Sequence, residues 1–353
     1  MFTKVALVSY SVTWTGLYAS LVEEPVAFIP LDDPTDTREV AQVLDTANVV
    51  IGPWPTCAVP NYNVRLVQST EAGVEQYDKK NQFPETEFLC IVYEYEQAIA
   101  EYVFMALLSL RRDLMRCDKS LRIGNWGTGD PVPDIAGSTL GVEEFGRIGR
   151  ALIVPCRSFK MNIIGVTAQN SVGAPPEGVK FLDGPDSIGP ILVESDVVVV
   201  AVPQTAQTIG LIGVREVTMI KRSAALIDVG RGPVVDETAL YDALSTNRLA
   251  GAAIDVWYRY PQTDELCIPS NLPFHNSPNV VMTPHQAGAY EQRYARRRAI
   301  IANNIDRISR REQPINVVWE PKAVLSNSRA SFAKKEDSKN EGHKNTMDAN
   351  RGS

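Results

Sequence analysis

A chain of 353 residues is long enough for two domains, and its hydrophobic fraction of 44% is typical of globular proteins. Its formal net charge of −7 gives no footprint for nucleic acid, and no apolar run reaches the ~18 residues of a membrane-spanning helix. The five cysteines form no C-x-x-C pair, which argues against zinc and disulfides. We therefore expect a cytoplasmic protein without a metal site, a nucleic-acid partner or a membrane anchor.

The first third of the chain predicts a small α/β domain, because strand-like segments are separated by helix-length stretches. The expected strands are residues 4–9, 48–51 and 65–69. Ala72 and Gly73 follow in a turn whose amides can approach an anion, although a plain turn is the simpler interpretation. Residues 96–117 keep a 3.6-residue apolar period and predict one long helix. Residues 122–137 have the composition of a crossing between domains, with Trp126 as its anchor.

Residues 138–150 contain part of a dinucleotide-binding fingerprint, in which three glycines follow a strand and open a helix. Gly146 and Gly149 occupy the last two glycine positions, but Glu144 stands at the first. A carboxylate there repels a diphosphate, and Pro155 should kink or break the helix that follows. This segment alone is poor evidence for nucleotide binding.

Strands alternate with helices over the next 130 or so residues, which predicts a doubly wound parallel sheet. The expected strands are residues 162–166, 196–203, 226–229, 249–257 and 279–283. Thr167 stands where an acid would favour NAD, and no arginine adjoins it to favour NADP, so neither preference is predicted. A helix over 290–311 carries the basic run 296–298, interpreted as a solvated face rather than a nucleic-acid patch. Residues 326–353 should be disordered.

Arg231 lies between Gly230 and Gly232 directly after the expected strand 226–229. Ligands of open α/β sheets bind at the carboxyl ends of the strands, and a guanidinium suits a carboxylate held by two hydrogen bonds. An isolated Gly-Arg-Gly is more simply a surface turn, so this interpretation depends on its context. His285 follows the expected strand 279–283 and has a proton that is mobile near neutral pH.

The segments SDVVVVAVPQTAQTIGLIG, IDVGRGPVVDETAL, LAGAAIDVW and NVVMTPHQAG, together with QSTEAGVEQYD and AIAEYVFMALLSLRR, resemble the D-isomer-specific 2-hydroxyacid dehydrogenase family. That family includes glyoxylate and hydroxypyruvate reductases, phosphoglycerate dehydrogenase and formate dehydrogenase. The resemblance covers roughly residues 49–317 and implies a homodimer whose Rossmann domain is inserted into a smaller flavodoxin-like α/β substrate domain. The implied segments are 1–118 (substrate domain), 119–289 (Rossmann domain), 290–320 (returning helix) and 321–353 (disordered tail).

The resemblance also implies roles for individual residues. Arg231 matches the arginine that binds the substrate carboxylate, and His285 matches the imidazole that protonates the substrate carbonyl. Asp255 matches the residue that binds the nicotinamide carboxamide, although a structural capping aspartate is an equal alternative without the family. The implied NAD- or NADP-binding residues are Gly146, Arg147, Ile148, Gly149, Thr167, Pro203, Thr205, Val229, Gly230, Asp255, His285 and Ala287. The implied substrate-binding residues are Ala72, Gly73, Val74 and Arg231.

Four residues depart from the family pattern: Glu144, Thr167, Ile91 and Tyr260. Tyr260 replaces the glutamate that usually pairs with the catalytic histidine, so His285 should hold its proton less firmly and reduction should favour a more acidic pH. Two functions remain open. One is an NAD(P)-dependent oxidoreductase that interconverts a small 2-oxo acid and its D-2-hydroxy acid. The other is a catalytically impaired member that binds a ligand or a protein partner, as the corepressors of this family do.

Overall fold

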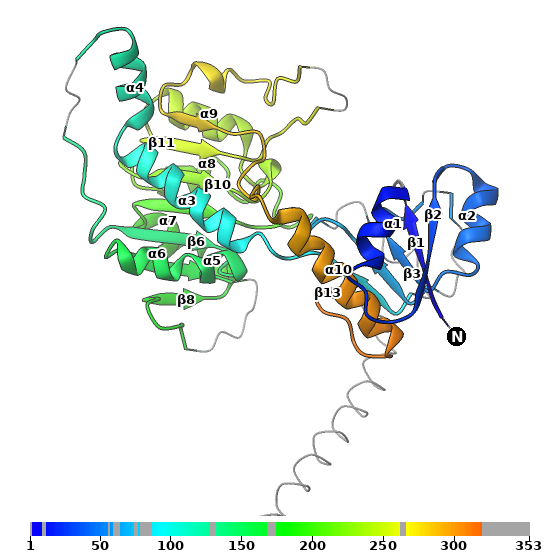
Figure 1. The fold of residues 1–353 in the computed structure, drawn as a ribbon. Helices are drawn as coiled ribbons and strands as arrows, with labels where there is room; N and C mark the ends of the chain where they lie inside the picture. The colour runs from blue at the N-terminus through cyan, green and yellow to red at the C-terminus, as the bar shows by residue number, and fades with distance from the viewer. Residues whose placement is uncertain are drawn as a thin grey trace, which may run out of the picture. The chain divides into compact units, whose positions relative to one another are not determined.

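The computed structural model describes residues 2–8, 12–55, 57–58, 64–73, 77, 86–126, 131–167, 174–261 and 266–319. The chain divides into two compact units (Figure 1). Unit 1 contains residues up to Glu94 and from Gln292 onward, and unit 2 contains the residues between them, Tyr95 to Glu291. Unit 2 thus lies between two parts of unit 1 along the chain, and it begins at Tyr95, whereas the expected boundary is residue 118.

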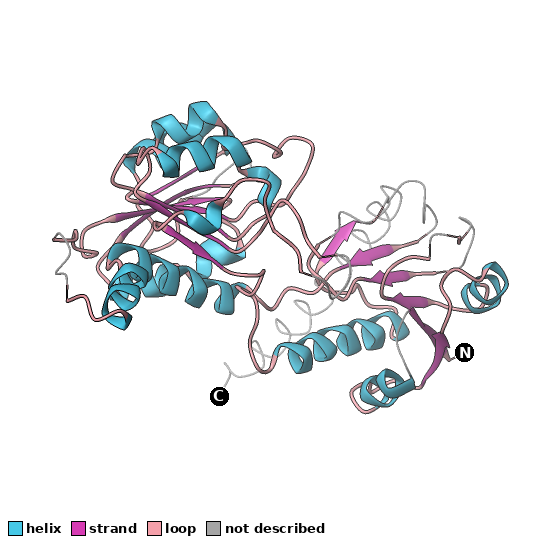
Figure 2. Ribbon diagram, turned by 90° about the horizontal axis from the view of Figure 1, so that it is seen from above, coloured by secondary structure: helices cyan, strands magenta, loops and turns pink. Residues whose placement is uncertain are grey.

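Unit 2 is built around a seven-stranded parallel sheet in the order β8-β7-β6-β9-β10-β11-β12, with helices on both faces (Figure 2). Its strands are β6 (Thr139–Glu143), β7 (Asn162–Val166), β8 (Phe181–Asp183), β9 (Val197–Val200), β10 (Ala225–Asp228), β11 (Gly251–Ile254) and β12 (Val280–Met282). Its helices are α3 (Glu96–Arg111), α4 (Leu114–Arg122), α5 (Arg147–Ala151), α6 (Ile153–Ser158), α7 (Ile188–Glu194), α8 (Val214–Met219) and α9 (Glu237–Ser245), with short 3-10 turns η1 (Pro185–Ser187), η2 (Gly232–Val234) and η3 (Phe274–Asn276). The strand order is that of the Rossmann fold, which confirms the predicted doubly wound sheet.

The continuous valine run of β9 reflects burial on both faces of this sheet. Val197 and Val199 pack with α3 and α6, whereas Val198 and Val200 pack with α7, α8 and α9. All four side chains are at most 1% exposed. Strand order reverses between β6 and β9, and ligands of such sheets bind outside the carboxyl ends of the strands at that reversal.

Unit 1 contains a six-stranded sheet in the order β13-β5-β4-β3-β1-β2. Its elements are β1 (Thr3–Val8), α1 (Val12–Ala19), β2 (Val26–Leu31), α2 (Thr37–Leu44), β3 (Val49–Ile51), β4 (Leu66–Gln68), β5 (Phe88–Cys90), α10 (Arg293–Ser309) and β13 (Val317–Trp319). The first five strands are parallel and β13 is antiparallel to β5. The order 2-1-3-4-5 among the first five strands is flavodoxin-like, as the resemblance implied. Residues of α1 and α10 pack on one face of the sheet and residues of α2 on the other.

Three expectations for residues 96–126 are wrong. The predicted long helix is two helices, because the chain turns at Arg112 and Asp113, and Asp113 has a φ of 50°. The boundary between the units precedes α3, because the buried face of α3 packs into the core of the Rossmann sheet. Trp126 is not the predicted anchor of residues 122–137, since 84% of its surface is exposed in the described part of the chain. The tail from residue 321 lies outside the described residues.

Candidate active site

The predicted site residues of unit 2 lie where adjacent parallel strands end. Loops that follow β6, β9, β10, β11 and β12 carry every predicted cofactor-binding residue except Thr167, which follows β7. Because these strands run in parallel and in register, all their carboxyl ends lie at one edge of the sheet. Sequence positions more than 100 residues apart are thereby collected on one side of unit 2.

The two glycines around Arg231 allow neighbouring loops to approach its backbone. A Cβ atom at Gly230 would lie 2.6 Å from the carbonyl oxygen of Val202, and one at Gly232 would overlap the backbone of Trp257. The loops after β9 and β11 therefore enclose the segment, which explains why glycine flanks the arginine. Arg231 is half-buried, and its Nη1 donates to the Gly230 carbonyl oxygen over 2.8 Å. Thus the guanidinium is held at the carboxyl edge of the sheet and still reaches its surface.

Asp228, the last residue of β10, lies beneath this loop and is 1% exposed. Its Oδ1 accepts a hydrogen bond from the amide of Gly230 over 3.1 Å. Burial raises the pKa of Asp228 well above its usual range, the bond from Gly230 opposes this rise, and the charges of Glu143 and Asp255 add to it. Asp228 thus ties the start of the arginine loop, and its burial favours the neutral acid over the carboxylate.

Asp255 fixes the loop that carries His285. Its carboxylate accepts from the hydroxyl of Thr283 (2.5 Å) and from the amides of Gln286 and Ala287 (2.8 Å each), and its carbonyl oxygen accepts from the amide of His285 (2.9 Å). Asp255 is 1% exposed, and the hydroxyl of Tyr102 lies 2.7 Å from that of Thr283. Asp255 therefore has the structural role that the sequence analysis gave as the alternative to nicotinamide binding: it holds the loop that follows β12. Burial raises the pKa of Tyr102 to about 12, so this phenol stays neutral.

Tyr260 lies beside the predicted catalytic histidine. Its ring centroid lies 5.6 Å from that of the exposed His285 imidazole, at an interplanar angle of 52°. Burial raises the pKa of Tyr260, and the positive charge of Arg231 opposes this rise, which places the guanidinium within electrostatic range of the phenol. Sequence positions 231, 260 and 285 thus come together in unit 2.

The fingerprint turn keeps its backbone path although Glu144 replaces a glycine. Glu144 adopts a φ of 67°, the left-handed conformation that favours glycine. Gly146 begins α5, and its missing Cβ would lie 3.5 Å from the Oε1 of Glu144. Gly149 is required because a Cβ there would lie 2.9 Å from the ring of Phe145. The carboxylate therefore lies beside the turn, as the sequence suggested.

The helix after the fingerprint is interrupted, as Pro155 predicted. α5 ends at Ala151, and Pro155 occupies the first turn of α6, where a missing amide hydrogen costs little. Ile148 packs against the core, whereas Arg147 is exposed. The first residue of α5 is therefore an exposed arginine.

The remaining cofactor-side residues line the same edge. The hydroxyl of Thr208 donates to the carbonyl oxygen of Pro203 over 2.7 Å and lies 3.1 Å from the Oγ1 of Thr205, which fixes the turn after β9. Val229 is buried and its amide donates to Val200 over 3.0 Å. Thr167 follows β7 and is half-buried, and its amide donates to the carbonyl oxygen of Asp183 over 2.9 Å.

The predicted substrate-binding turn of unit 1 follows β4. Ala72 and Gly73 are half-buried there, and Val74 lies outside the described residues. Ser69 closes the turn, because its hydroxyl donates to the carbonyl oxygen of Glu71 (2.9 Å) and accepts from the amide of Glu71 (3.1 Å). The carboxylate of Glu71 also accepts from Arg297 of α10 over 2.6 Å. The turn is thus attached to the returning helix.

Arg297 corrects the interpretation of the basic run 296–298 as a solvated face. The side chain is buried, with 8% of the residue exposed, and also pairs with the buried Glu94 at 3.5 Å. The sequence contained the signal, since Arg297 lies four residues before Ile301 on the buried face of α10.

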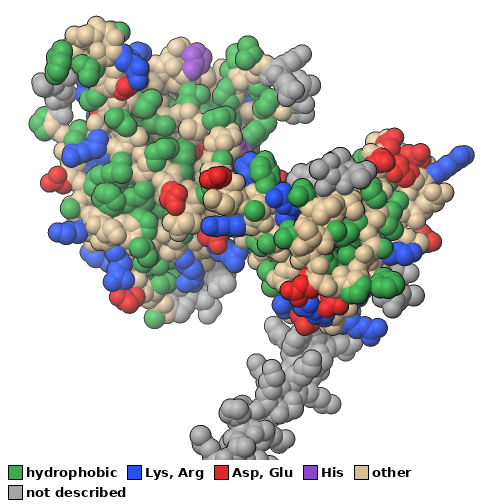
Figure 3. Space-filling view, viewed as in Figure 1, with side chains coloured by type: hydrophobic (Ala, Val, Ile, Leu, Met, Phe, Trp, Pro, Cys, Tyr) green, Lys and Arg blue, Asp and Glu red, His purple; other side chains and the backbone are tan. Residues whose placement is uncertain are grey.

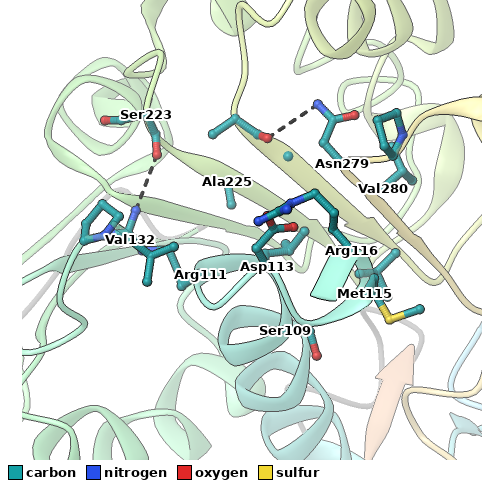
Figure 4. Close-up of a pocket in the computed structure, with 16 residues that line it drawn as sticks. Ser109, Arg111, Asp113, Met115, Arg116, Val132, Ser223, Ala225, Asn279 and Val280 are labelled. Atoms are coloured by element: carbon teal, nitrogen blue, oxygen red, sulfur yellow. Dashed lines mark hydrogen bonds and ion pairs between the residues drawn. The ribbon is translucent and has the colours of Figure 1, made fainter. Parts of the chain in front are cut away.

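A cavity of about 420 Å³ lies elsewhere in unit 2 and is not the predicted site (Figure 4). Its lining includes Ala225, Gly251 and Val280, the first residues of β10, β11 and β12, so it lies at the amino edge of the sheet. Arg111 borders it, and its guanidinium contacts the carbonyl oxygen of Ser223 at 3.4 Å. Among the described residues, no group of three or more His, Cys, Asp or Glu side chains could hold a metal ion.

Two participants were not identified from the sequence. No role is assigned to Asp228 from the sequence, although an acidic residue at the end of an apolar strand, two residues before Gly230, is a usable signal. The bond between Tyr102 and Thr283 joins helix α3 to the histidine loop, and no local pattern indicates it.

Comparison with known proteins agrees with this geometry. Residues 104–287 match the family model of the D-isomer specific 2-hydroxyacid dehydrogenase NAD binding domain. A glyoxylate reductase of Korarchaeum cryptofilum is 30% identical over 294 residues, 82% of this chain and 80% of the relative. A D-3-phosphoglycerate dehydrogenase of Methanocaldococcus jannaschii is 30% identical over 226 residues, which are 64% of this chain but only 41% of that relative.

Solved structures share the fold. A D-isomer specific 2-hydroxyacid dehydrogenase from Xanthobacter autotrophicus in complex with NADPH and MES superposes with a TM-score of 0.72 at 24% identity, covering 90% of this chain and 98% of the other. The NAD complexed form of a Lactobacillus delbrueckii family member gives a TM-score of 0.70 at 22% identity, covering 90% of this chain and 100% of the other. The protein belongs to the D-isomer specific 2-hydroxyacid dehydrogenase family.

Proposed function

We propose that this protein is an NAD(P)-dependent oxidoreductase that reduces a small 2-oxo acid to its D-2-hydroxy acid. The main support is the convergence of Arg231, Tyr260 and His285 at the carboxyl edge of the Rossmann sheet. The loop of Arg231 is hydrogen-bonded to the buried Asp228, and the loop of His285 is hydrogen-bonded to the buried Asp255. Both loops are therefore held in place before a substrate binds.

The residues of unit 2 fit a dinucleotide, with one unfavourable contact. Glu144 adopts the left-handed conformation that a glycine favours at this turn, and Gly146 is the N-cap of α5. Burial raises the pKa of Glu143 to about 8, so this neighbouring acid is predominantly neutral at pH 7. The opposing charge is therefore that of Glu144, which is half-buried. No acid at Thr167 selects NAD, which leaves both cofactors open.

The chain's own groups would then act as follows. Arg231 binds the substrate carboxylate and orients the adjacent carbonyl. The amides of Ala72 and Gly73 are the substrate-binding groups that we propose for unit 1. His285 gives its proton to the carbonyl oxygen. A bound reduced nicotinamide supplies the hydride that reduces the carbonyl carbon. In the reverse direction His285 accepts the hydroxyl proton.

A substrate screen tests this function directly. Purified protein is assayed with NADH and NADPH against glyoxylate, hydroxypyruvate, pyruvate and bulkier 2-oxo acids. Arg231→Ala should raise KM strongly and lower kcat, and Arg231→Lys should recover only part of both, because the planar fork is lost. His275→Gln, in the exposed 3-10 turn η3, is the matched control for His285→Gln. Unchanged turnover in Arg231→Ala would refute the assigned role.

A second function is favoured by the position of Glu144. Its carboxylate beside Gly146 opposes diphosphate binding, as in a member that has lost catalysis and serves as a ligand- or protein-binding module. Titration of nicotinamide fluorescence separates the two functions. If neither NADH nor NADPH binds at millimolar concentration, the oxidoreductase proposal fails.

We also propose that the protein is a homodimer formed through unit 2. Exposed hydrophobic side chains gather over α3, α4 and the segment after α4 (Figure 3), namely Met105, Leu114, Met115, Leu121, Ile123 and Trp126. A second copy of the chain would cover them. Sedimentation equilibrium should give a dimer, and Leu121→Glu with Trp126→Ser should give a monomer.

We further propose a cytoplasmic location. All five cysteines are free, as expected in a reducing compartment. No helix in the described part of the chain is long and apolar enough to cross a membrane. Fractionation of the native host cells with detection of the protein tests the location.

A further inference from the structure

The cavity at the amino edge of the Rossmann sheet is bordered by a buried positive charge. Its lining comes from the end of α3, the start of α4, residues 132–133 and the amino ends of β10, β11 and β12 (Figure 4). Arg111, the last residue of α3, is one of the lining residues, and only 9% of its surface is exposed. A guanidinium that is withdrawn from water to this extent is ordinarily paired with a carboxylate. The partners of Arg111 therefore indicate what the cavity can bind.

The hydrogen bonding of Arg111 is incomplete. Its Nη1 donates to the carbonyl oxygen of Ser223 over 3.4 Å, which is long for a hydrogen bond. Its Nε is buried and has no hydrogen-bond partner among the described residues. Asp113 is the one acidic residue among the described residues of the lining, and its carboxylate forms an ion pair with Arg116. Within the described part of the chain, the charge of Arg111 is thus not neutralised by a carboxylate.

The rest of the lining is mainly apolar and includes Leu110, Met115, Val132 and Val280. Met115 and Val132 are 53% and 37% exposed, so this apolar surface is partly uncovered. The volume of about 420 Å³ lies within the range of small-molecule sites, which are mostly apolar and contain a few polar groups that orient the ligand. A buried cation at the border of an apolar cavity is suited to a ligand that carries a negative charge on an apolar body.

We propose that this cavity is a binding site for an organic monocarboxylate with an apolar body. The carboxylate pairs with Arg111, and the hydrocarbon part covers the apolar lining. One negative charge is sufficient, because Arg116 and Asp113 already neutralise each other. The site is separate from the catalytic edge, since the first residues of β10 and β12 line it, whereas Arg231 and His285 follow the last residues of these strands. The proposal therefore does not depend on the reductase function.

Octanoate is the probe, and octan-1-ol is the comparison that keeps the hydrocarbon chain without the charge. Calorimetric titration of the full chain should show one site for octanoate and weaker binding of octan-1-ol. Arg111→Met keeps an unbranched side chain and loses the charge, so octanoate affinity should fall by about 10- to 100-fold and the preference over octan-1-ol should disappear. Arg122→Met is the matched control, because Arg122 is an exposed arginine of α4 that pairs with Asp118. It should leave octanoate affinity unchanged.

Ala250→Phe tests the cavity while leaving Arg111 in place. Ala250 is exposed and lines the cavity, so a larger side chain there occupies the volume without entering the core. Its carbonyl oxygen accepts from the side-chain amide of Asn279 over 3.4 Å, a contact that the substitution preserves. Octanoate affinity should fall, and thermal unfolding should give a midpoint close to that of the parent.

Two other variants test whether the carboxylate binds elsewhere and whether a second copy of the chain fills the cavity. Octanoate binding should persist in Arg231→Ala, and its loss there would overturn the proposal by placing the ligand at the catalytic edge. Met115 lines the cavity and also belongs to the hydrophobic surface that we assign to the homodimer. Octanoate is therefore titrated into Leu121→Glu with Trp126→Ser, for which we expect the affinity of the parent. Binding in this variant alone would overturn the proposal, because a second copy would then occupy the cavity.

Two further results would overturn the site. One is the absence of octanoate binding at about 10 mM, and the other is equal octanoate affinity in the parent and in Arg111→Met. Octanoate binding that depends on Arg111, in a protein that reduces no 2-oxo acid, would refute the reductase function and leave this site intact.

Discussion

Glu143 gives the protein a pH dependence that can be worked out from its position. It is the last residue of β6, 4% exposed, and its Oε2 has no hydrogen-bond partner among the described residues. Burial, followed by the charges of Glu144 and Glu216, raises its pKa from 4.5 to about 8. In the folded chain, the group therefore holds its proton at neutral pH.

The sign of the effect follows from proton binding. Between pH 4.5 and about 8 the folded state binds this proton and the unfolded state does not, so the free energy of unfolding falls as pH rises through that window. The difference between about 8 and 4.5, at about 1.4 kcal/mol per pKa unit, corresponds to about 5 kcal/mol at pH 9. Water entering around the ionised group makes this an upper limit.

Glu143→Gln removes the titration and nearly preserves the side-chain volume. Urea unfolding of both proteins, followed by circular dichroism from pH 5 to 9, should give midpoints that diverge as pH rises, with the variant more stable at pH 9. Affinity for NADH should weaken above pH 8 in the parent more than in the variant. Glu144→Gln removes one of the charges that raise the pKa of Glu143 but leaves Glu143 buried, so it should reduce the pH dependence of stability without abolishing it. Parallel stability curves for the parent and Glu143→Gln would refute the reasoning.

Three further substitutions probe the turns that support the site. Glu144→Gly removes a left-handed glutamate and its charge, so fluorescence titration should show tighter NADH binding and thermal unfolding a gain of up to about 1 kcal/mol. Gly230→Ala places a methyl group 2.6 Å from the Val202 carbonyl, so steady-state assays should show lost turnover and unfolding a loss of about 1–3 kcal/mol. Arg297→Met breaks the buried pair with Glu94, so unfolding should show a loss of about 3 kcal/mol and kinetics a raised KM for the 2-oxo acid.

The sequence predicts strands well where local composition reflects burial. The valine run of β9 is continuous because both faces of that strand are covered, and the run alone predicts a central parallel strand. The domain boundary could not be predicted in the same way. The amphipathic pattern of residues 96–111 shows that a helix buries one face, but it does not show which sheet receives that face.

The features of the site also differ in whether the sequence could predict them. Arg231 and His285 could be predicted because each follows a strand, and parallel strands deliver their carboxyl ends to one edge. The contact between Tyr260 and His285 could not, because it depends on the paths of two loops. The family pattern indicated only that a carboxylate is missing there, and the structure supplies what occupies the position.

The acids at the carboxyl edge illustrate why a count of charges misjudges this site. Four acidic residues lie at or just after the carboxyl ends of β6, β10 and β11, namely Glu143, Glu144, Asp228 and Asp255. If all four were ionised, they would repel the diphosphate of a dinucleotide. Asp255 accepts three hydrogen bonds, an arrangement that suits a carboxylate committed to holding a loop. Glu143 and Asp228 are buried with fewer donors, and burial raises the pKa of Glu143 to about 8 and that of Asp228 well above its usual range. Repulsion of a dinucleotide therefore reduces to one residue, Glu144, which is half-buried on a strained turn and is the change most able to separate a working reductase from an impaired one.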